Sequence, residues 1–147
     1  MKFPDLTYDI KEKLNSVLKK HRLKFIILHG SYAKGTAHKE SDVDIALFAG
    51  RLVDAPKIFD IYGEIDEVLR GLNLGELDIK FIDRADPLFR YLVVRSSILL
   101  AGNESDYNEF KAYAFRDYLD SADLRMLERK MIDYKIKELS KHYTHAR

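Results

Sequence analysis

The sequence contains no cysteine, so the chain can form neither a disulfide bond nor a zinc–thiolate site. This absence is compatible with a reducing compartment, and we predict a cytoplasmic protein. Long apolar runs are also absent, because no stretch approaches the roughly 20 apolar residues that span a bilayer. The N-terminal segment MKFPDLTYDIKEKLN is interrupted by Pro4 and by charges, and it lacks the apolar core of a signal peptide. We therefore expect no association with a membrane.

An excess of either charge is missing as well. The chain has 25 Lys and Arg against 24 Asp and Glu, which gives a formal net charge of +1. Such a chain offers no broad basic field for a nucleic-acid backbone, so we expect no direct nucleic-acid binding. Its 147 residues, 46% of them hydrophobic, are enough for one domain with a core of its own.

The segment from His29 to Leu47, HGSYAKGTAHKESDVDIAL, carries the clearest chemical pattern. The apolar residues Phe25 to Leu28 before it predict a buried strand that ends at a glycine. If Ser31 opens a short helix that Gly35 closes, the Ser31 hydroxyl and the first free backbone N–H groups point at one spot. Such a spot suits a phosphate.

Two familiar phosphate-binding motifs do not account for this segment. Gly30 and Gly35 have the glycine spacing of a P-loop, but Thr36 and Ala37 stand where that motif requires Lys and Ser or Thr. A Gly-x-Gly-x-x-Gly dinucleotide turn is also absent from the sequence. The segment therefore belongs to neither class.

Two aspartates follow in a stretch with the composition of a strand, Ser41 to Phe48. Side chains alternate along a strand, so Asp42 and Asp44 are expected on one face and the apolar residues between and after them on the other. Neighbouring carboxylates repel unless a cation lies between them, and hard oxygen ligands favour Mg²⁺ held together with substrate phosphates. The pattern predicts a metal and nucleoside triphosphate site.

A third carboxylate lies in the next predicted strand, Gly75 to Ile82. Aspartate is disfavoured inside strands, so Asp78 calls for a reason, whereas Glu76 and Asp83 lie at the strand ends and are weaker candidates. Three arginines that follow are alternative phosphate contacts: Arg84, Arg90 and Arg95.

The remaining segments are predicted to pack around these strands. Helical spacing is found over Thr7 to Lys20, with Thr7 as the cap, over Ile58 to Leu69, and after a cap at Asp86. A short strand is expected at Ser97 to Leu100. We predict an α/β (α+β) fold in which helices flank a small mixed β-sheet.

The C-terminal segment is helical in pattern from Asp106 to about Leu139, with a second cap-like signal at Asp120 to Asp123. Either one long helix bends there or two helices meet. We predict a main domain over residues 1–105 and a helical extension of the same domain over 106–147. The extension carries more aromatic and Met side chains than one helical face can bury, which predicts a contact surface unless bending folds them all into the core. They are Tyr107, Phe110, Tyr113, Phe115, Tyr118, Leu119, Met131 and Tyr134.

The central segment resembles the signature of the DNA polymerase β-like nucleotidyltransferase superfamily, which is Gly-Ser, ten further residues and then Asp-x-Asp. Gly30, Ser31, Asp42 and Asp44 match it without a gap. Within the superfamily, the short length and the form SDVDIALF are most similar to the minimal nucleotidyltransferases, the antitoxins encoded beside HEPN-domain toxins. The resemblance covers about residues 23–100.

This resemblance implies a nucleotidyltransferase fold and a site with defined roles. It implies that Gly30, Ser31 and Ser41 bind the nucleotide, that Asp42, Asp44 and Asp78 are catalytic, and that the same three carboxylates hold two Mg²⁺ ions. It also implies ATP as the donor and a tyrosine of a HEPN ribonuclease toxin as the acceptor, within a hetero-oligomer. Two other functions stay open: an antitoxin that acts by binding alone, and a small-molecule nucleotidyltransferase.

Overall fold

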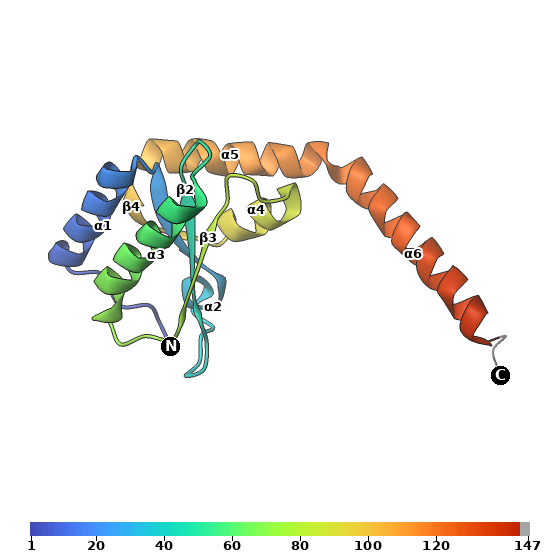
Figure 1. The fold of residues 1–147 in the computed structure, drawn as a ribbon, viewed down its shortest axis with the longest axis horizontal. Helices are drawn as coiled ribbons and strands as arrows, with labels where there is room; N and C mark the ends of the chain where they lie inside the picture. The colour runs from blue at the N-terminus through green and yellow to red at the C-terminus, as the bar shows by residue number, and fades with distance from the viewer. Residues whose placement is uncertain (145–147) are drawn as a thin grey trace.

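A computed structural model describes residues 1–144, so the last three residues of the predicted extension lie outside the described part. The helices and strands follow one another in this order along the chain (Figure 1): α1 (Tyr8–His21), β1 (Phe25–His29), α2 (Gly30–Lys34), β2 (Val43–Phe48), α3 (Ala55–Arg70), β3 (Leu77–Phe81), α4 (Pro87–Val94), β4 (Ile98–Gly102), α5 (Glu104–Asp120) and α6 (Ala122–Thr144).

The four strands form one mixed sheet in the order β3-β2-β1-β4. Strand β1 pairs antiparallel with both β2 and β4, whereas β2 and β3 run parallel and are joined through α3. A parallel pair needs such a crossover, because a tight hairpin can join only antiparallel strands. The predicted mixed sheet with flanking helices is confirmed.

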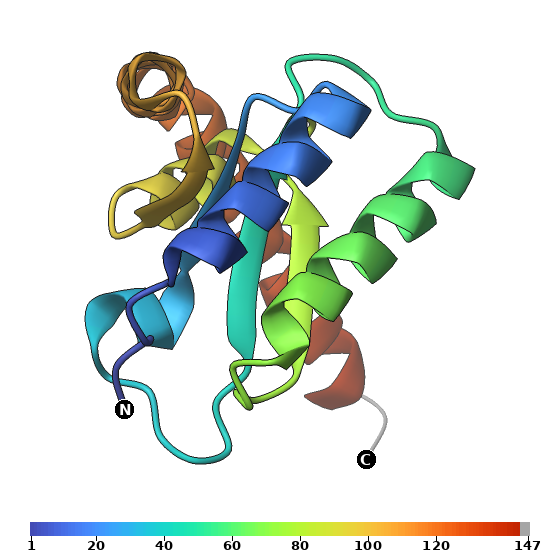
Figure 2. The same ribbon diagram turned by 90° about the vertical axis from the view of Figure 1, so that its left-hand side faces the viewer.

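Helices cover both faces of the sheet (Figure 2). Helices α1 and α3 pack on one face, where alternate residues of β1 and β2 such as Leu28 and Ile45 are fully buried. Helices α4 and α5 pack on the other face against Phe25, Ile27 and Ala46. This division follows from the period of two along each strand.

Polar caps set several helix starts. The predicted caps Thr7 and Asp86 are confirmed, since their side chains accept backbone N–H groups at 3.4 and 3.0 Å. Helix α3 begins at Ala55, before the predicted Ile58, because Pro56 is well suited to the first turn of a helix. Helix α5 begins at Glu104 because the Asn103 side chain caps it.

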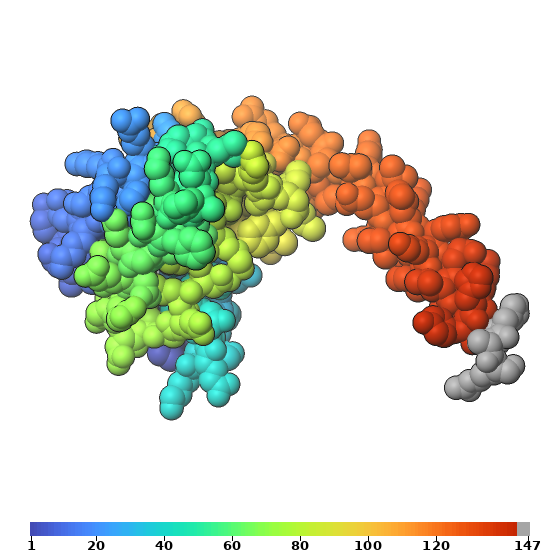
Figure 3. Space-filling view, viewed as in Figure 1, coloured from blue at the N-terminus to red at the C-terminus, as the bar shows by residue number. Residues whose placement is uncertain are grey.

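Two helices meet at Ser121, as one of the two C-terminal alternatives predicted. Arg125 stabilises this junction: its Nη1 donates to the Tyr118 carbonyl at 2.6 Å and to Ser121 Oγ at 2.5 Å. Its guanidinium also lies 3.9 Å from the centre of the Tyr118 ring, a cation–π contact. Beyond the junction, α6 projects away from the sheet and its layers (Figures 1 and 3).

The two C-terminal helices differ in the burial of their apolar side chains. Tyr107 and Phe110 of α5 are buried on the sheet, whereas Met131 and Tyr134 of α6 are 63% and 68% exposed. The alternative in which bending folds the whole aromatic set into the core is therefore wrong. No helix within residues 1–144 is both long enough and apolar enough to cross a membrane.

Candidate active site

The strand register brings two of the predicted carboxylates together. Asp44 of β2 is the register partner of Asp78 on the parallel strand β3, and of His29 on the antiparallel strand β1. All three point to the face that carries Ala46, the side covered by α4 and α5, and all three are partly exposed. The site therefore lies across three neighbouring strands at one end of the sheet.

Gly30 packs against the Asp44 side chain. Its backbone has φ +70°, and a Cβ atom placed on it would lie 2.0 Å from Asp44 Oδ2. Only glycine combines this backbone conformation with so close an approach. Ser31 follows in the first turn of the five-residue helix α2, which Gly35 ends with a left-handed conformation. The Asp44 carboxylate thus fills the space beside the Gly30 backbone that the side chain of any larger residue would need.

Ser41 and Asp42 lie before β2 and not within it, because the strand begins at Val43. Ser41 is buried, and its Oγ accepts the His38 N–H at 2.9 Å while its own N–H donates to the His38 carbonyl at 3.0 Å. These bonds close the loop that leads into β2. Asp42 is exposed. Nucleotide binding by Ser41 stays a prediction.

Lys80 is a polar neighbour of the site that sequence reasoning did not single out. It lies two residues after Asp78 on the same face of β3, and its Nζ lies 2.5 Å from Asp78 Oδ2. The hydrogen bond to Asp78 raises the pKa of Lys80, and the charge of Asp44 acts in the same direction. A signal was available in the sequence, since residues two apart in a strand share a face.

His29 completes the polar group and was also missed as a site residue. Burial lowers the pKa of His29 below its ordinary value, and the charge of Asp44 partly offsets this effect. The ring packs edge-on to Phe89 of α4, with centroids 6.5 Å apart. A neutral imidazole is thus favoured beside the carboxylates.

Two of the rival candidates, Asp83 and Arg90, are engaged elsewhere. The Asp83 carboxylate accepts the backbone N–H groups of Ala49 and Gly50, the latter at 2.7 Å, and so holds the loop after β2. Arg90 is buried and donates to the Asp117 carboxylate at 2.9 Å, to Tyr113 and to two carbonyls. Its side chain ties α4 to α5 and is not a free phosphate contact.

The donor chemistry at this end of the sheet fits Mg²⁺, although the ligands are not gathered. Within residues 1–144, no three His, Asp or Glu side chains form a ready metal cluster. Asp44 and Asp78 nevertheless offer carboxylate oxygens in register, and both side chains are partly exposed. A metal set of Asp42, Asp44 and Asp78 stays a prediction.

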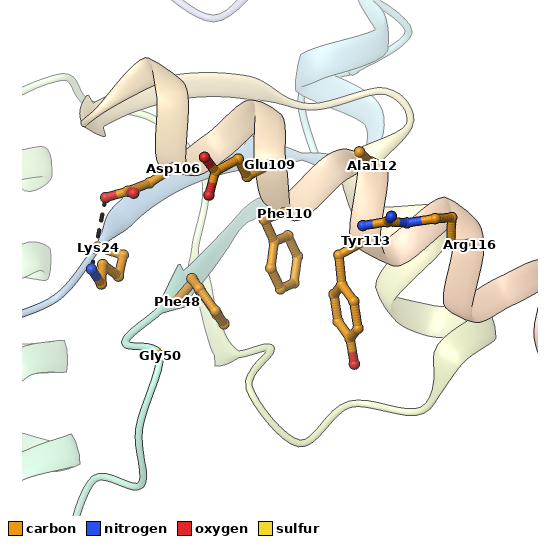
Figure 4. Close-up of a pocket in the computed structure, with 9 residues that line it drawn as sticks. All are labelled: Lys24, Phe48, Gly50, Asp106, Glu109, Phe110, Ala112, Tyr113 and Arg116. Carbon is orange, nitrogen blue, oxygen red and sulfur yellow. Dashed lines mark ion pairs between the residues drawn. The ribbon is translucent and has the colours of Figure 1, made fainter.

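A cavity of about 580 Å³ lies at the other end of β2, where Phe48, Phe110 and Tyr113 form an apolar wall (Figure 4). Lys24 and Asp106 pair across its rim at 3.9 Å. It contains none of the predicted site residues. The paired carboxylates, and not this cavity, define the candidate site.

The family described as "Polymerase beta, Nucleotidyltransferase" matches residues 12–106, which is most of the chain and includes the paired carboxylates. The chain belongs to this family of nucleotidyltransferases. No curated protein matches the sequence significantly.

Solved structures share the fold over nearly their whole length. A chain of a toxin–antitoxin complex with AMP-PNP is 24% identical with a TM-score of 0.64, and the match covers 86% of this chain and 98% of that chain. A chain of an MntA–HepT toxin–antitoxin structure is 20% identical with a TM-score of 0.59, covering 88% and 99%. A structure of a tri-AMPylated Shewanella oneidensis HEPN toxin with its MNT antitoxin has 21% identity and a TM-score of 0.59, covering 86% and 96%.

Proposed function

We propose that the chain is the antitoxin of a toxin–antitoxin pair and transfers AMP from ATP to a tyrosine of a HEPN-domain toxin. The observation that carries this proposal is the in-register pair Asp44 and Asp78 beside Gly30, in a chain of the nucleotidyltransferase family. The solved complexes with AMP-PNP and with an AMPylated HEPN toxin support the choice of donor and acceptor.

The reaction assigns a role to each residue of the site. The tyrosine oxygen forms a bond to the α-phosphorus of ATP while the bond from that phosphorus to the pyrophosphate oxygen breaks. Asp78 accepts the proton of the tyrosine hydroxyl, and Gly30 and Ser31 contact the outer phosphates. Two Mg²⁺ ions held among Asp42, Asp44 and Asp78 would neutralise charge on the reacting phosphates.

The partner is expected to bind the C-terminal helices. Aromatic, Leu and Met side chains are exposed along α5 and α6, and such side chains are enriched in protein interfaces. Most helical stability in proteins comes from the packing of an apolar face, so α6, which projects from the sheet, gains from a partner. The contact side chains include Leu119, Leu124, Leu127, Met131 and Tyr134. The complex would be a hetero-oligomer.

An antitoxin that acts by binding alone is the second candidate. It is favoured by the absence of a ready three-ligand cluster within residues 1–144, and by the exposed surface of α6, which is separate from the carboxylates. Such a protein would need α6 but not Asp44.

Mass spectrometry of the toxin co-expressed with this chain decides between the two. Wild type should add one or more AMP units to a toxin tyrosine, and Asp42→Asn and Asp44→Asn should add none. If all three proteins neutralise the toxin and no adduct is found, the binding-only function replaces this proposal.

The contact surface is tested separately by placing a charge on α6. Met131→Glu should weaken toxin binding by about tenfold or more, because burying an unpaired carboxylate among apolar side chains costs more than about 1.4 kcal/mol. Lys137→Glu makes a larger charge change on a polar part of the same helix and should have little effect. ATP binding should be equal in both variants. Equal toxin binding by both variants would move the contact off α6.

A further inference from the structure

Lys80 reaches back along its own strand to the carboxylate pair. It follows Asp78 by two residues on the same face of β3, and its register partner on β2 is the small residue Ala46. The Lys80 side chain turns back toward that aspartate, with Nζ 2.5 Å from Asp78 Oδ2. The charge of Asp44 also acts on this ammonium group. One cation thus contacts Asp78 and lies within electrostatic reach of Asp44 on the neighbouring strand.

The pair needs such a cation for a simple electrostatic reason. Neighbouring strands are about 4.8 Å apart, so two ionised carboxylates in register repel each other. Near them are His29, whose burial favours the neutral ring, and Lys34, which acts on His29. Tyr62 of α3 also lies near, and burial together with the charge of Asp78 raises its pKa, so its hydroxyl stays protonated. Lys80 is the group in direct contact with Asp78.

We infer that Lys80 is an internal counter-ion that occupies Asp78 until a divalent cation replaces it, and that the released ammonium then binds the nucleotide phosphates. This inference rests on the proposed function, since it takes Asp44 and Asp78 as the cation site. Its steps are exchanges of ion pairs, and no covalent bond changes.

The exchange is physically reasonable for this side chain. The Lys80 side chain is 51% exposed, so solvent and a ligand can both reach its ammonium. A divalent ion carries twice the charge of the ammonium and can bind Asp44 and Asp78 together. A lysine ammonium is a point charge on a flexible stem, which lets it leave Asp78 and follow a phosphate on the same face.

Binding of Mn²⁺ to the nucleotide-free protein, followed by electron paramagnetic resonance, tests whether a divalent cation competes with Lys80 for Asp78. Lys80→Met removes the charge at similar length and should bind Mn²⁺ about two- to fivefold more tightly than wild type, the scale for an exposed ion pair. Lys24→Met is the matched control, because Lys24 is 52% exposed and pairs with Asp106 at the other end of the sheet. It should bind Mn²⁺ as wild type does, and Asp44→Asn should bind it poorly.

Calorimetry with ATP and Mg²⁺ tests whether the released Lys80 ammonium binds the nucleotide phosphates. Lys80→Met should bind ATP about two- to fivefold more weakly, and Lys80→Arg should restore most of the affinity, since a cation and not a particular shape is needed. Equal Mn²⁺ affinity in wild type and Lys80→Met would overturn the counter-ion role and leave the proposed function standing. Equal ATP affinity would overturn the phosphate role. A wild type that binds no Mn²⁺ would overturn both the inference and the metal-dependent function.

Discussion

The two faces of β2 differ in what they do, although their residues alternate along one strand. Val43, Ile45 and Leu47 are fully buried under α1 and α3. Asp44, between the first two, points to the opposite face and remains partly exposed beside Asp78. The strand therefore contributes to stability with one set of side chains and to the candidate chemistry with the other. Substitutions one residue apart should have separable effects.

The largest effect is expected from Asp44→Asn. It should lower AMP transfer by about 10²- to 10⁴-fold, because a neutral amide is a poor ligand for a cation and leaves the reacting phosphates without compensation. The free energy of unfolding should stay the same or rise, since the change removes a charge repelled by Asp78. Transfer kinetics and urea unfolding measure the two effects. A large loss of stability would show that the faces are not independent.

The neighbouring substitution Ile45→Ala should have the reverse profile. It should lower the free energy of unfolding by about 2–5 kcal/mol, because it leaves a cavity in the core under α1 and α3. The folded fraction of the variant should keep its transfer rate. Urea unfolding gives the first value, and transfer measured per folded molecule at low temperature gives the second. If the folded Ile45→Ala protein transfers AMP more slowly than wild type, the two faces of β2 do not act independently.

Gly30→Ala should affect both properties to an intermediate degree. The substitution strains a backbone with φ +70° and brings a methyl group against Asp44 Oδ2, so we expect a loss of about 1–3 kcal/mol in stability and weaker ATP binding. Gly35→Ala is the matched control: its φ is +73°, but nothing lies within 4 Å of the added atom. The control should show only the backbone cost. Equal losses in both variants would mean that Asp44 moves aside freely.

The smallest effect is expected on the pH dependence of stability, through an ion pair between α1 and α3. Lys20 of α1 hydrogen-bonds Glu64 of α3 at 2.6 Å and lowers the pKa of Glu64 below its ordinary 4.5, and His21 adds to this effect. A carboxyl group with a lowered folded pKa stabilises the fold above pH 4.5, and this contribution is lost as the pH falls through the folded value. Urea unfolding at pH 6 and pH 3 should therefore show a smaller pH dependence for Glu64→Gln. Glu67→Gln, an exposed change on the same helix, should follow wild type.

Local pattern predicted the faces of β2 and β3 well, because alternation follows from the backbone of a strand. It placed Asp44 on the face of β2 opposite the apolar residues, and the register shows that Asp78 of β3 lies beside it. It failed for the start of β2, since the hydrogen bonds of Ser41 with His38 keep Ser41 and Asp42 outside the strand. It also missed Lys80, because residue spacing gives a face but does not say in which direction a long side chain leans.

The C-terminal helices mark another limit of sequence reasoning. Their apolar spacing indicated helix and a surplus of aromatic side chains, and the junction at Ser121 was among the predicted alternatives. Spacing alone could not assign Phe110 to the core and Met131 to solvent. That difference depends on where the sheet ends, which is set by residues far away in the sequence.

The angle at the Ser121 junction also determines where the far end of α6 lies. A helix of 23 residues is about 35 Å long, so a turn of about 10° at its base displaces its far end by about 6 Å. The contacts of Arg125 with Tyr118 and Ser121 resist such a turn. For a partner bound near the C-terminal end of α6, the contacts of Arg125 at the junction would therefore set its distance from the sheet. Small changes at the junction would alter which side chains of the partner lie near Asp44 and Asp78.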